Sequence, residues 1–197
     1  NPGDRILDPA CGTGGFIVVG FNYVSEKIRQ VERKTWKNPD APTSVEEKRL
    51  YDKIHKVGES IFGLDFNANL VKTAQMNMVM KNDGRGGLFW VNSLLNPSAW
   101  PKAVQQAIEL GSMDVVITNP PFGTKIKIED QDILEQYDLA HAWRKEGGKW
   151  IMNGALRNAM PPEILFIERC VQFLKPGKGQ LGIVLPEGVL GNPDNEY

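Results

Sequence analysis

"RILDPACGTGGF" (residues 5–16) opens with a short apolar run and ends in a glycine-rich turn. The glycines at positions 12, 14 and 15 let the backbone turn sharply and approach a ligand closely. After the turn, apolar residues recur at helical spacing, at Ile17, Phe21, Val24, Ile28 and Val31. The stretch therefore predicts a strand, a glycine turn and an amphipathic helix whose N-terminus presents free N–H groups to a ligand.

The spacing of the glycines restricts the kind of ligand. The turn does not match the GxGxxG dinucleotide pattern, and no lysine follows it to form a phosphate-binding P-loop. Because Asp8 precedes the turn, a ligand with both a cationic group and a carboxylate would suit it. Asp65 ends a second apolar run, "SIFGLDF" (60–66), where an acid can accept hydrogen bonds from ribose hydroxyls. Together these features predict S-adenosylmethionine as cofactor; the alternative is a glycine turn with a solvated aspartate at each strand end.

The composition is that of one globular domain. Of the 197 residues, 41% are hydrophobic and 24% are charged, and the formal net charge is −1. No global basic field indicates nucleic acid, so a partner is expected to supply much of any affinity for phosphates. Cys11 and Cys170 are far apart, as expected of free thiols in a reducing cytosol. No Cys/His cluster has metal-ligand spacing and no run of about 18 apolar residues occurs, so we expect a cytoplasmic protein with neither a metal site nor a membrane contact.

The remaining apolar runs predict three more strands, at 86–95 after the turn "NDGRGG" (82–87), at 113–119 and at 179–186. Helices alternate with the strands, and one opened by Pro162 has an apolar stripe of Ile164, Ile167, Val171 and Leu174. This order predicts an α/β fold, a mostly parallel sheet with helices on both faces. Residues 33–58 are expected to be an insertion with a capping box at Ser44 and Glu47, and residues 123–160 an irregular flap.

"VITNPPFG" (residues 116–123) ends the fourth strand in an unusual way. Two prolines stop the ladder because they lack the backbone N–H that a neighbouring strand needs. They also fix the backbone, so that Asn119 and the carbonyls around it point in one direction. Such a turn is expected where a flat polar group must be held against an aromatic ring.

"DPACGTGGF" followed by "NPPF" resembles the Rossmann-like S-adenosylmethionine-dependent DNA methyltransferases that act on the N6 amine of adenine. The context, with "AQMNMVMKNDG", "VNSLL" and "PPEILFIERCVQFLKPGKGQLGIVLPEGVLGN", is similar to the methylation subunit of type I restriction-modification systems. The resemblance covers nearly the whole chain apart from residues 33–58. It implies that residues 1–197 are a fragment of a catalytic domain that continues beyond both ends. It also implies double-stranded DNA with a flipped adenine as substrate, and a specificity subunit and a restriction subunit as partners.

The family pattern also implies a role for each residue of the motifs. The wall around the methionine part of the cofactor would comprise Asp8, Cys11, Gly12, Thr13, Gly14 and Gly15. Asp65 would hold the ribose and Phe66 would lie near the cofactor adenine, while Asn92 stands where many relatives have an acid that accepts from the cofactor amine. The catalytic turn would be Asn119, Pro120, Pro121 and Phe122. In it, Asn119 and the Pro120 carbonyl accept hydrogen bonds from the target amine and Phe122 stacks on the flipped base.

Two other functions remain open from the sequence. An N-methyltransferase acting on a protein glutamine or on RNA needs the same clamp, and a non-catalytic platform subunit would bind cofactor and DNA without reacting. In the flap, the basic residues include Lys125, Lys127, Arg144 and Lys149, which are candidates for contacting DNA or a partner. Its six basic residues are matched by six acidic ones, so a solvated flap is an equal alternative.

Overall fold

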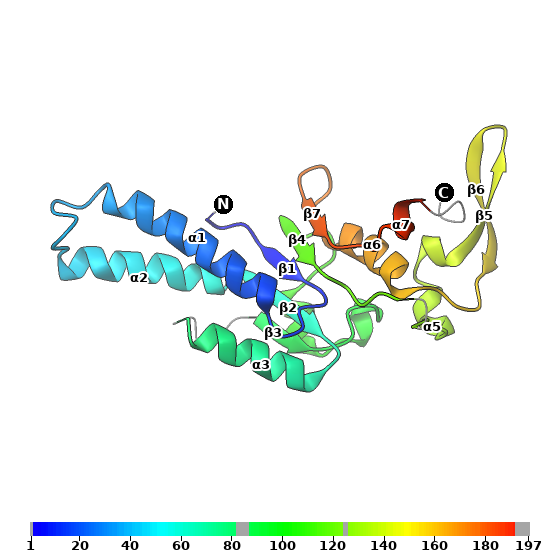
Figure 1. The fold of residues 1–197 in the computed structure, drawn as a ribbon, viewed down its shortest axis with the longest axis horizontal. Coiled ribbons are helices and arrows are strands. Elements are labelled where there is room, and N and C mark those ends of the chain that lie inside the picture. Colours follow the sequence, from blue (N-terminus) through cyan, green and yellow to red (C-terminus); the bar gives the residue numbers. More distant parts are fainter. Residues whose placement is uncertain (1, 82–86, 124–125, 192–197) are drawn as a thin grey trace.

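The computed structural model describes residues 2–81, 87–123 and 126–191, so most of the turn at 82–87 and Lys125 lie outside the described residues. Five parallel strands form one sheet in the order β3-β2-β1-β4-β7 (Figure 1). The strands are β1 (Ile6–Asp8), β2 (Ile61–Asp65), β3 (Gly87–Trp90), β4 (Val115–Thr118) and β7 (Gln180–Ile183). Each strand lies within a predicted one, and the prediction of a parallel sheet is confirmed.

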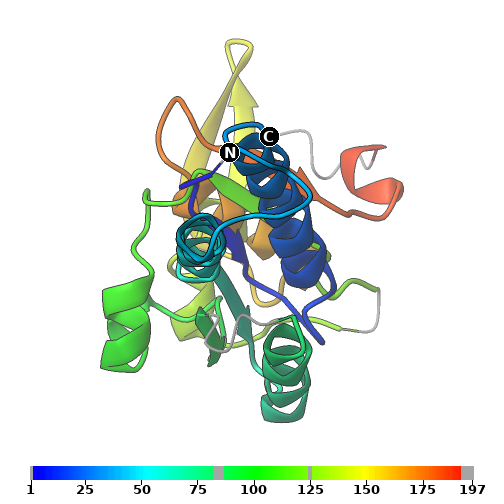
Figure 2. The same cartoon turned by 90° about the vertical axis from the view of Figure 1, so that its left-hand side faces the viewer.

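Helices cover both faces of the sheet, as predicted. One core cluster joins the strands to α1 (Gly15–Arg33), α2 (Ser44–Gly58) and α3 (Ala68–Val79). A second cluster joins the other face to α4 (Lys102–Ala107) and α6 (Pro162–Phe173). Figure 2 shows α1 and α3 to one side of the strands and α4 to the other. Adjacent strand residues divide between the faces: Ile6 is in the first cluster and Leu7 in the second, as the two-residue period of a strand requires.

The predicted insertion at 33–58 consists of the last residue of α1, a loop and α2, which runs alongside α1 (Figure 1). The predicted capping box was wrong by one residue. Thr43 Oγ1 accepts from the Glu46 amide at 3.3 Å, and the Glu46 carboxylate accepts from the Thr43 amide at 2.8 Å. The predicted pair Ser44–Glu47 and the observed pair Thr43–Glu46 have the same spacing, so the sequence does not distinguish them. The backbone does, because Thr43 is extended whereas Ser44 is already helical.

The flap at 123–160 is not irregular, which corrects the prediction. It contains α5 (Gln131–Leu134), the 3-10 helix η2 (Asp138–Ala140) and an antiparallel hairpin of β5 (His141–Glu146) and β6 (Lys149–Leu156). A backbone bridge between Ile128 and Met160 closes its base. Ile133, Leu134 and Tyr137 pack with residues of α6 in a third core cluster, so the base of the flap is part of the fold. The short elements η1 (Pro97–Ala99) and α7 (Gly188–Gly191) complete the described chain. None of the helices described is long and apolar enough to cross a bilayer.

Arg169 on α6 is buried, with 1% of its surface exposed, and it joins three parts of the molecule. Its Nε donates to the Tyr137 hydroxyl at 2.8 Å, and an Nη donates to the Leu94 and Leu95 carbonyls at 3.2 Å. The Tyr137 hydroxyl donates to the same Leu94 carbonyl at 2.9 Å. Polar groups buried in this way stabilise a fold only while they keep their partners. Arg169 thus ties the flap to the loop that follows β3.

We expect Arg169→Met to lower the free energy of unfolding by about 2–3 kcal/mol, because it leaves buried carbonyls and a hydroxyl short of hydrogen bonds. Urea denaturation followed by circular dichroism measures this effect. Arg29→Met on α1 is the matched control, because Arg29 is only partly buried and forms a solvent-accessible ion pair with Glu26 at 3.7 Å; we expect a change of less than about 0.5 kcal/mol. Equal losses in the two variants would contradict a stabilising role for the buried network.

Candidate functional site

A cavity of about 500 Å³ lies at the carboxyl edge of the sheet. β1 and β4 are neighbours, but the chain leaves β1 towards β2 and leaves β4 towards β7, on opposite sides. Ligands of open α/β sheets bind in the crevice at such a switch point. The cavity is lined by residues that follow β1, β2, β3 and β4, among them six predicted site residues: Gly12, Asp65, Phe66, Asn92, Asn119 and Pro121.

The glycine turn is held tightly between β1 and the helices. Gly12 and Gly14 have φ angles of 52° and 85°, which side-chain-bearing residues rarely adopt. A Cβ atom on Gly14 would also lie 3.0 Å from the Ala74 Cβ of α3. Glycine is therefore required at position 14 by backbone conformation and by the close approach of α3.

The Asp65 carboxylate connects the end of β2 to the glycine turn. Its Oδ2 accepts from the Gly12 amide at 2.9 Å, and its Oδ1 accepts from the Asn67 amide at 2.8 Å. A carboxylate has about four lone-pair sites, so each oxygen retains acceptor capacity towards the cavity. Asp65 can therefore shape the turn and still accept hydrogen bonds from a ligand's hydroxyls.

Asp8 is buried beneath the turn, with 1% of its surface exposed, and it does not line the cavity. Its Oδ1 accepts from the Thr118 hydroxyl at 2.7 Å and from the Ala10 amide at 3.1 Å. Burial raises the pKa of Asp8 from 3.8 to about 6, against the opposing effect of these two hydrogen bonds. Thr118, at the end of β4, was not identified from the sequence; it connects Asp8 to the strand that carries Asn119.

The raised pKa of Asp8 makes stability depend on pH. Because its pKa is higher in the folded than in the unfolded state, the folded chain binds the extra proton between about pH 4 and 6, so stability falls as pH rises through that window. The loss by pH 8 is on the order of 3 kcal/mol. Asp8→Asn cannot ionise, so its stability relative to the wild type should be higher at pH 8 than at pH 4. Urea denaturation of both proteins at the two pH values tests this, and parallel pH profiles would contradict it.

The proline turn after β4 places Asn119 at the cavity. No other residue in the described ranges hydrogen-bonds the Asn119 side chain, which is exposed at the cavity wall. Pro120 is buried, and Phe122 is 45% exposed beyond the lining. The turn therefore offers an amide without a described partner, together with an exposed aromatic ring nearby in the chain.

Several other predicted site residues lie outside the cavity lining: Cys11, Thr13, Gly14, Gly15, Pro120 and Phe122. The Cys11 side chain packs in the core against Gly63, where an added Cβ would lie 3.0 Å from it. Burial raises the pKa of the Cys11 thiol well above its usual range, so the thiol is unreactive. Any contact of Cys11 with a cofactor would be through its backbone.

Several lining residues were missed in the sequence, notably Ser93, Ile128 and Phe166. The buried Ser93 hydroxyl donates to the Pro9 carbonyl at 2.7 Å and so fixes the loop after β3 to the glycine turn. Phe166 and Pro162 both line the cavity from α6. Their spacing of four residues places them on one helical face, and this was the available signal for Phe166.

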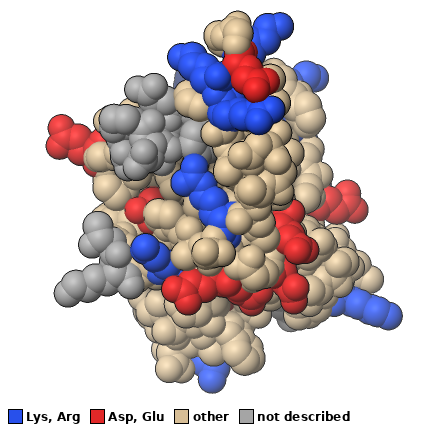
Figure 3. All heavy atoms as spheres, turned by 90° about the vertical axis from the view of Figure 1, so that its right-hand side faces the viewer, with Lys and Arg blue, Asp and Glu red and all other residues tan. Residues whose placement is uncertain are grey.

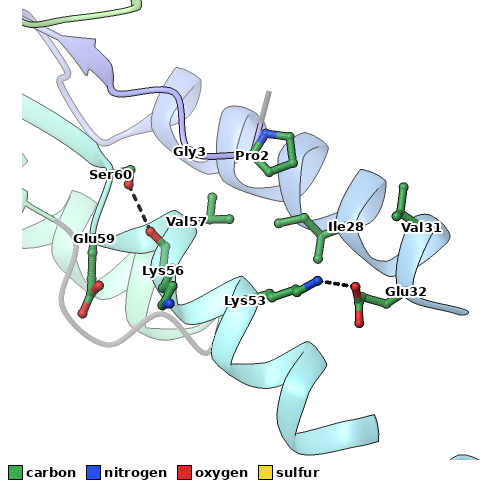
Figure 4. A pocket seen from close by; sticks show the side chains of 10 residues that line it. All are labelled: Pro2, Gly3, Ile28, Val31, Glu32, Lys53, Lys56, Val57, Glu59 and Ser60. Atoms are coloured by element: carbon green, nitrogen blue, oxygen red, sulfur yellow. Dashed lines mark hydrogen bonds and ion pairs between the residues drawn. The ribbon is translucent and has the colours of Figure 1, made fainter. Parts of the chain in front are cut away.

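A second cavity, of about 580 Å³, lies between α1 and α2 (Figure 4). Its walls include Ile28, Val57 and the buried Glu32, which forms ion pairs with Lys53 and, at 2.9 Å, with Arg49. The cavity is remote from the switch point and contains neither the glycine turn nor the proline turn. In the described residues no group of three or more His, Cys, Asp or Glu side chains is arranged to bind a metal ion. The cavity at the sheet edge is therefore the candidate site.

Comparisons with known proteins relate the chain to one family. A family model described as N-6 DNA Methylase matches residues 1–197. The chain is 25% identical over 189 residues to the methylase subunit of the type I restriction enzyme EcoEI from Escherichia coli, covering 95% of the chain and 29% of that subunit. Its fold is similar to that of a Vibrio vulnificus protein assigned as the modification subunit of a type I restriction enzyme. The TM-score is 0.59 at 24% identity, over 96% of this chain and 31% of that one.

A second solved structure identifies the fold more broadly. A Listeria monocytogenes protein assigned as a class I S-adenosylmethionine-dependent methyltransferase matches with a TM-score of 0.53 at 20% identity. The match covers 98% of this chain and 42% of that one. The fold is thus the Rossmann-like α/β fold of such methyltransferases. The chain spans less than half the length of each of these three proteins.

Proposed function

Because the chain belongs to the N-6 DNA methylase family, we propose that it transfers a methyl group from S-adenosylmethionine to the N6 amine of adenine in DNA. We propose further that it does so as the modification subunit of a type I restriction-modification complex. The observation that carries the proposal is the Asn119 amide at the wall of a cavity that also contains Asp65 and the glycine turn. Asn119 would thus accept from an amine, and Asp65 from a nucleoside ligand, in the same cavity.

The cofactor would lie against the ends of β1, β2 and β3. Asp65 would accept hydrogen bonds from its ribose hydroxyls, and Phe66 would pack on its adenine. The helix N-terminus after Gly14 would complement the carboxylate of its methionine part. Asp8 would act from beneath the turn, which it supports by accepting from the Ala10 amide. The Asn92 side-chain oxygen already accepts from the Leu94 amide at 3.0 Å, so it would use its second lone pair towards the cofactor amine.

The target adenine would enter the cavity from the side of the proline turn. The Asn119 side chain and the Pro120 carbonyl would accept hydrogen bonds from the N6 amine, and Phe122 would stack on the base. Two fixed acceptors would favour a pyramidal nitrogen with a localised lone pair, and the cofactor would supply an electrophilic methyl group whose S–C bond breaks to leave a neutral thioether. The extra proton on the methylated nitrogen would then pass to water. Catalysis would consist mainly of positioning and electrostatic preorganisation. Extruding the base from the duplex costs about a few kcal/mol, which stacking partly offsets.

The near-neutral charge supports the proposal that other subunits complete DNA recognition. With a formal net charge of −1, the chain lacks the overall positive charge that favours long-range attraction to phosphates. A specificity subunit would then select the sequence, and a restriction subunit would cleave unmodified DNA in the same complex.

The test is methyl transfer by the full-length protein, assembled with any subunits that purify with it. Radiolabelled S-adenosylmethionine is incubated with duplex DNA, with RNA or with protein, and the labelled product is identified by mass spectrometry. We expect N6-methyladenine in DNA. Methylated RNA or methylglutamine would replace the proposed substrate, and cofactor binding without transfer to any of the three would favour a platform subunit.

A further inference from the structure

The β5–β6 hairpin and the residue after it carry four of the six basic residues of the flap. Sequence counts give equal numbers of acidic and basic residues between positions 123 and 160, but the fold separates them. Five carboxylates lie in the base of the flap, from Glu129 to Asp138. The hairpin and the residue after it contain four cations and one carboxylate: Arg144, Lys145, Lys149, Arg157 and Glu146. In Figure 3 blue side chains gather around one red group at the top of the molecule, and a band of red side chains lies lower on the same face.

The hairpin is a regular two-stranded ribbon. Gly147 and Gly148 have φ angles of 56° and 81°, the geometry of a tight two-residue turn that matches the twist of the strands. The register pairs Lys145 with Trp150 and Arg144 with Ile151. Because neighbouring residues face opposite sides of a strand, cations occur on both faces of the ribbon.

Most of the ribbon beyond its base is uncovered. Its outer residues are exposed on both strands, including the apolar Ile151 and Met152, each 41% exposed. An isolated two-stranded hairpin is marginally stable in water, so a ribbon with two open faces gains from a binding partner. Two of its charges interact within the ribbon: Arg144 pairs with Glu146 at 3.1 Å, and the Lys145 ammonium lies 5.5 Å from the centre of the Trp150 ring. With four cations and one carboxylate, residues 141–157 carry a net positive formal charge.

The base of the ribbon adjoins the candidate site. Ile128, whose backbone bridges to Met160 at the start and end of the flap, lines the cavity. From there the ribbon projects beyond the carboxyl edge of the sheet, opposite to the end where α1 and α2 extend (Figure 1). A duplex that delivers a base into the cavity must lie outside this same edge.

We propose that the β5–β6 hairpin binds the backbone of duplex DNA beside the target base. The inference rests on the proposed function, because it takes its ligand from there. A two-stranded ribbon fits the major groove, which is about 12 Å wide, and its cations are placed to contact the phosphates along that groove. The hairpin would supply locally the phosphate contacts that the neutral overall charge does not provide.

The test compares salt dependence of DNA binding by the full-length protein and by Lys145→Gln/Lys149→Gln. Fluorescence anisotropy with an unmethylated duplex, without cofactor, gives the observed binding constant at several salt concentrations. Each lost phosphate contact lowers the slope of log K against log salt concentration by about 0.9, so we expect a slope smaller by about 1–2 and binding about tenfold weaker near 0.1 M salt. Unchanged cofactor binding by the variant verifies its fold.

Lys48→Gln/Lys56→Gln is the matched control, because it removes two exposed lysines from α2 at the other end of the molecule. We expect its slope to equal that of the wild type. A hairpin variant with the wild-type slope would overturn the inference. So would a hairpin variant that binds DNA normally but no longer purifies with its partner subunits, because the ribbon would then be a protein contact. The proposed function is assayed separately, by methyl transfer into the same duplex, so either proposal can fail while the other stands.

Discussion

Asn119→Ala is expected to lower the rate constant of methyl transfer by about 10²–10³-fold, the usual loss when one preorganised hydrogen-bonding group is removed from a reacting centre. The Asn119 amide has no partner in the described residues, so its removal breaks no internal hydrogen bond of that part of the structure. Cofactor affinity should therefore stay within about a factor of three of the wild type. Single-turnover transfer from labelled S-adenosylmethionine measures the rate, and titration calorimetry measures the affinity.

Two further variants test whether the lower rate of Asn119→Ala is caused by the loss of a hydrogen-bond acceptor. Asn119→Asp retains a side-chain acceptor and should keep more activity than Asn119→Ala if acceptance from the target amine is the role of this residue. Asn38→Ala makes the same chemical change in the exposed loop between α1 and α2 and should leave the rate unchanged. Full activity of Asn119→Ala would exclude the proline turn as the catalytic clamp. Equal, complete inactivity of the Asp and Ala variants would mean that shape or charge, rather than acceptance, is essential at this position.

The sheet could be predicted from the sequence because its signals are local. A strand buried on both faces reads as a continuous apolar run, and the residues after it are turn formers. Glycine at position 14 can adopt a backbone conformation that other residues rarely adopt, and proline at 120 and 121 has few permitted conformations. The two turns at the cavity are therefore recognisable from residue types alone. Because both turns follow strands of one parallel sheet, they are expected to meet at its carboxyl edge.

The flap was less predictable because its stability comes from contacts distant in sequence. Tyr137 and Arg169 meet through the fold, and Arg169 looks like an exposed residue in a helix whose predicted stripe included Val171. In the structure Ile164, Ile167 and Leu174 of the predicted stripe pack in the core, whereas Val171 is 58% exposed. The buried face extends instead to Arg169, which the stripe does not include. Phe166, which lines the cavity, was missed for the same reason. α6 is apolar over much of its circumference, and periodicity alone does not select the buried face of such a helix.

The hairpin has a local signal in the sequence. "EGGK" at 146–149 places two glycines between segments rich in aromatic and charged residues, a pattern typical of a two-residue hairpin turn. The charged residues in both segments obscured the alternation expected of strands. The separation of charge in the flap follows from this hairpin. A count of charges over the whole segment hides the separation, because it averages two surfaces that the fold keeps apart.

Asp65→Ala is expected to weaken binding of S-adenosylmethionine by about 100-fold or more. The carboxylate holds the Gly12 and Asn67 amides, so its removal loosens the turn and also deletes the proposed ribose acceptor. Hydrogen bonds to a charged group contribute about 1.5–3 kcal/mol each, and about 1.4 kcal/mol corresponds to a factor of ten in affinity. Titration calorimetry measures the affinity, and Asp52→Ala on the exposed side of α2 is a control of equal chemistry that should bind normally.

A cofactor analogue without ribose hydroxyls separates the two effects of Asp65. If the carboxylate binds the ribose, the wild type should bind this analogue more weakly than S-adenosylmethionine, whereas Asp65→Ala should bind both equally. Such non-additivity is the signature of a direct contact. If Asp65 acts only by holding the turn, the variant should lose the same factor of affinity for both ligands, and the ribose would have to be held by another group. Binding of S-adenosylmethionine to Asp65→Ala with wild-type affinity would exclude both roles and would move the cofactor site away from the end of β2.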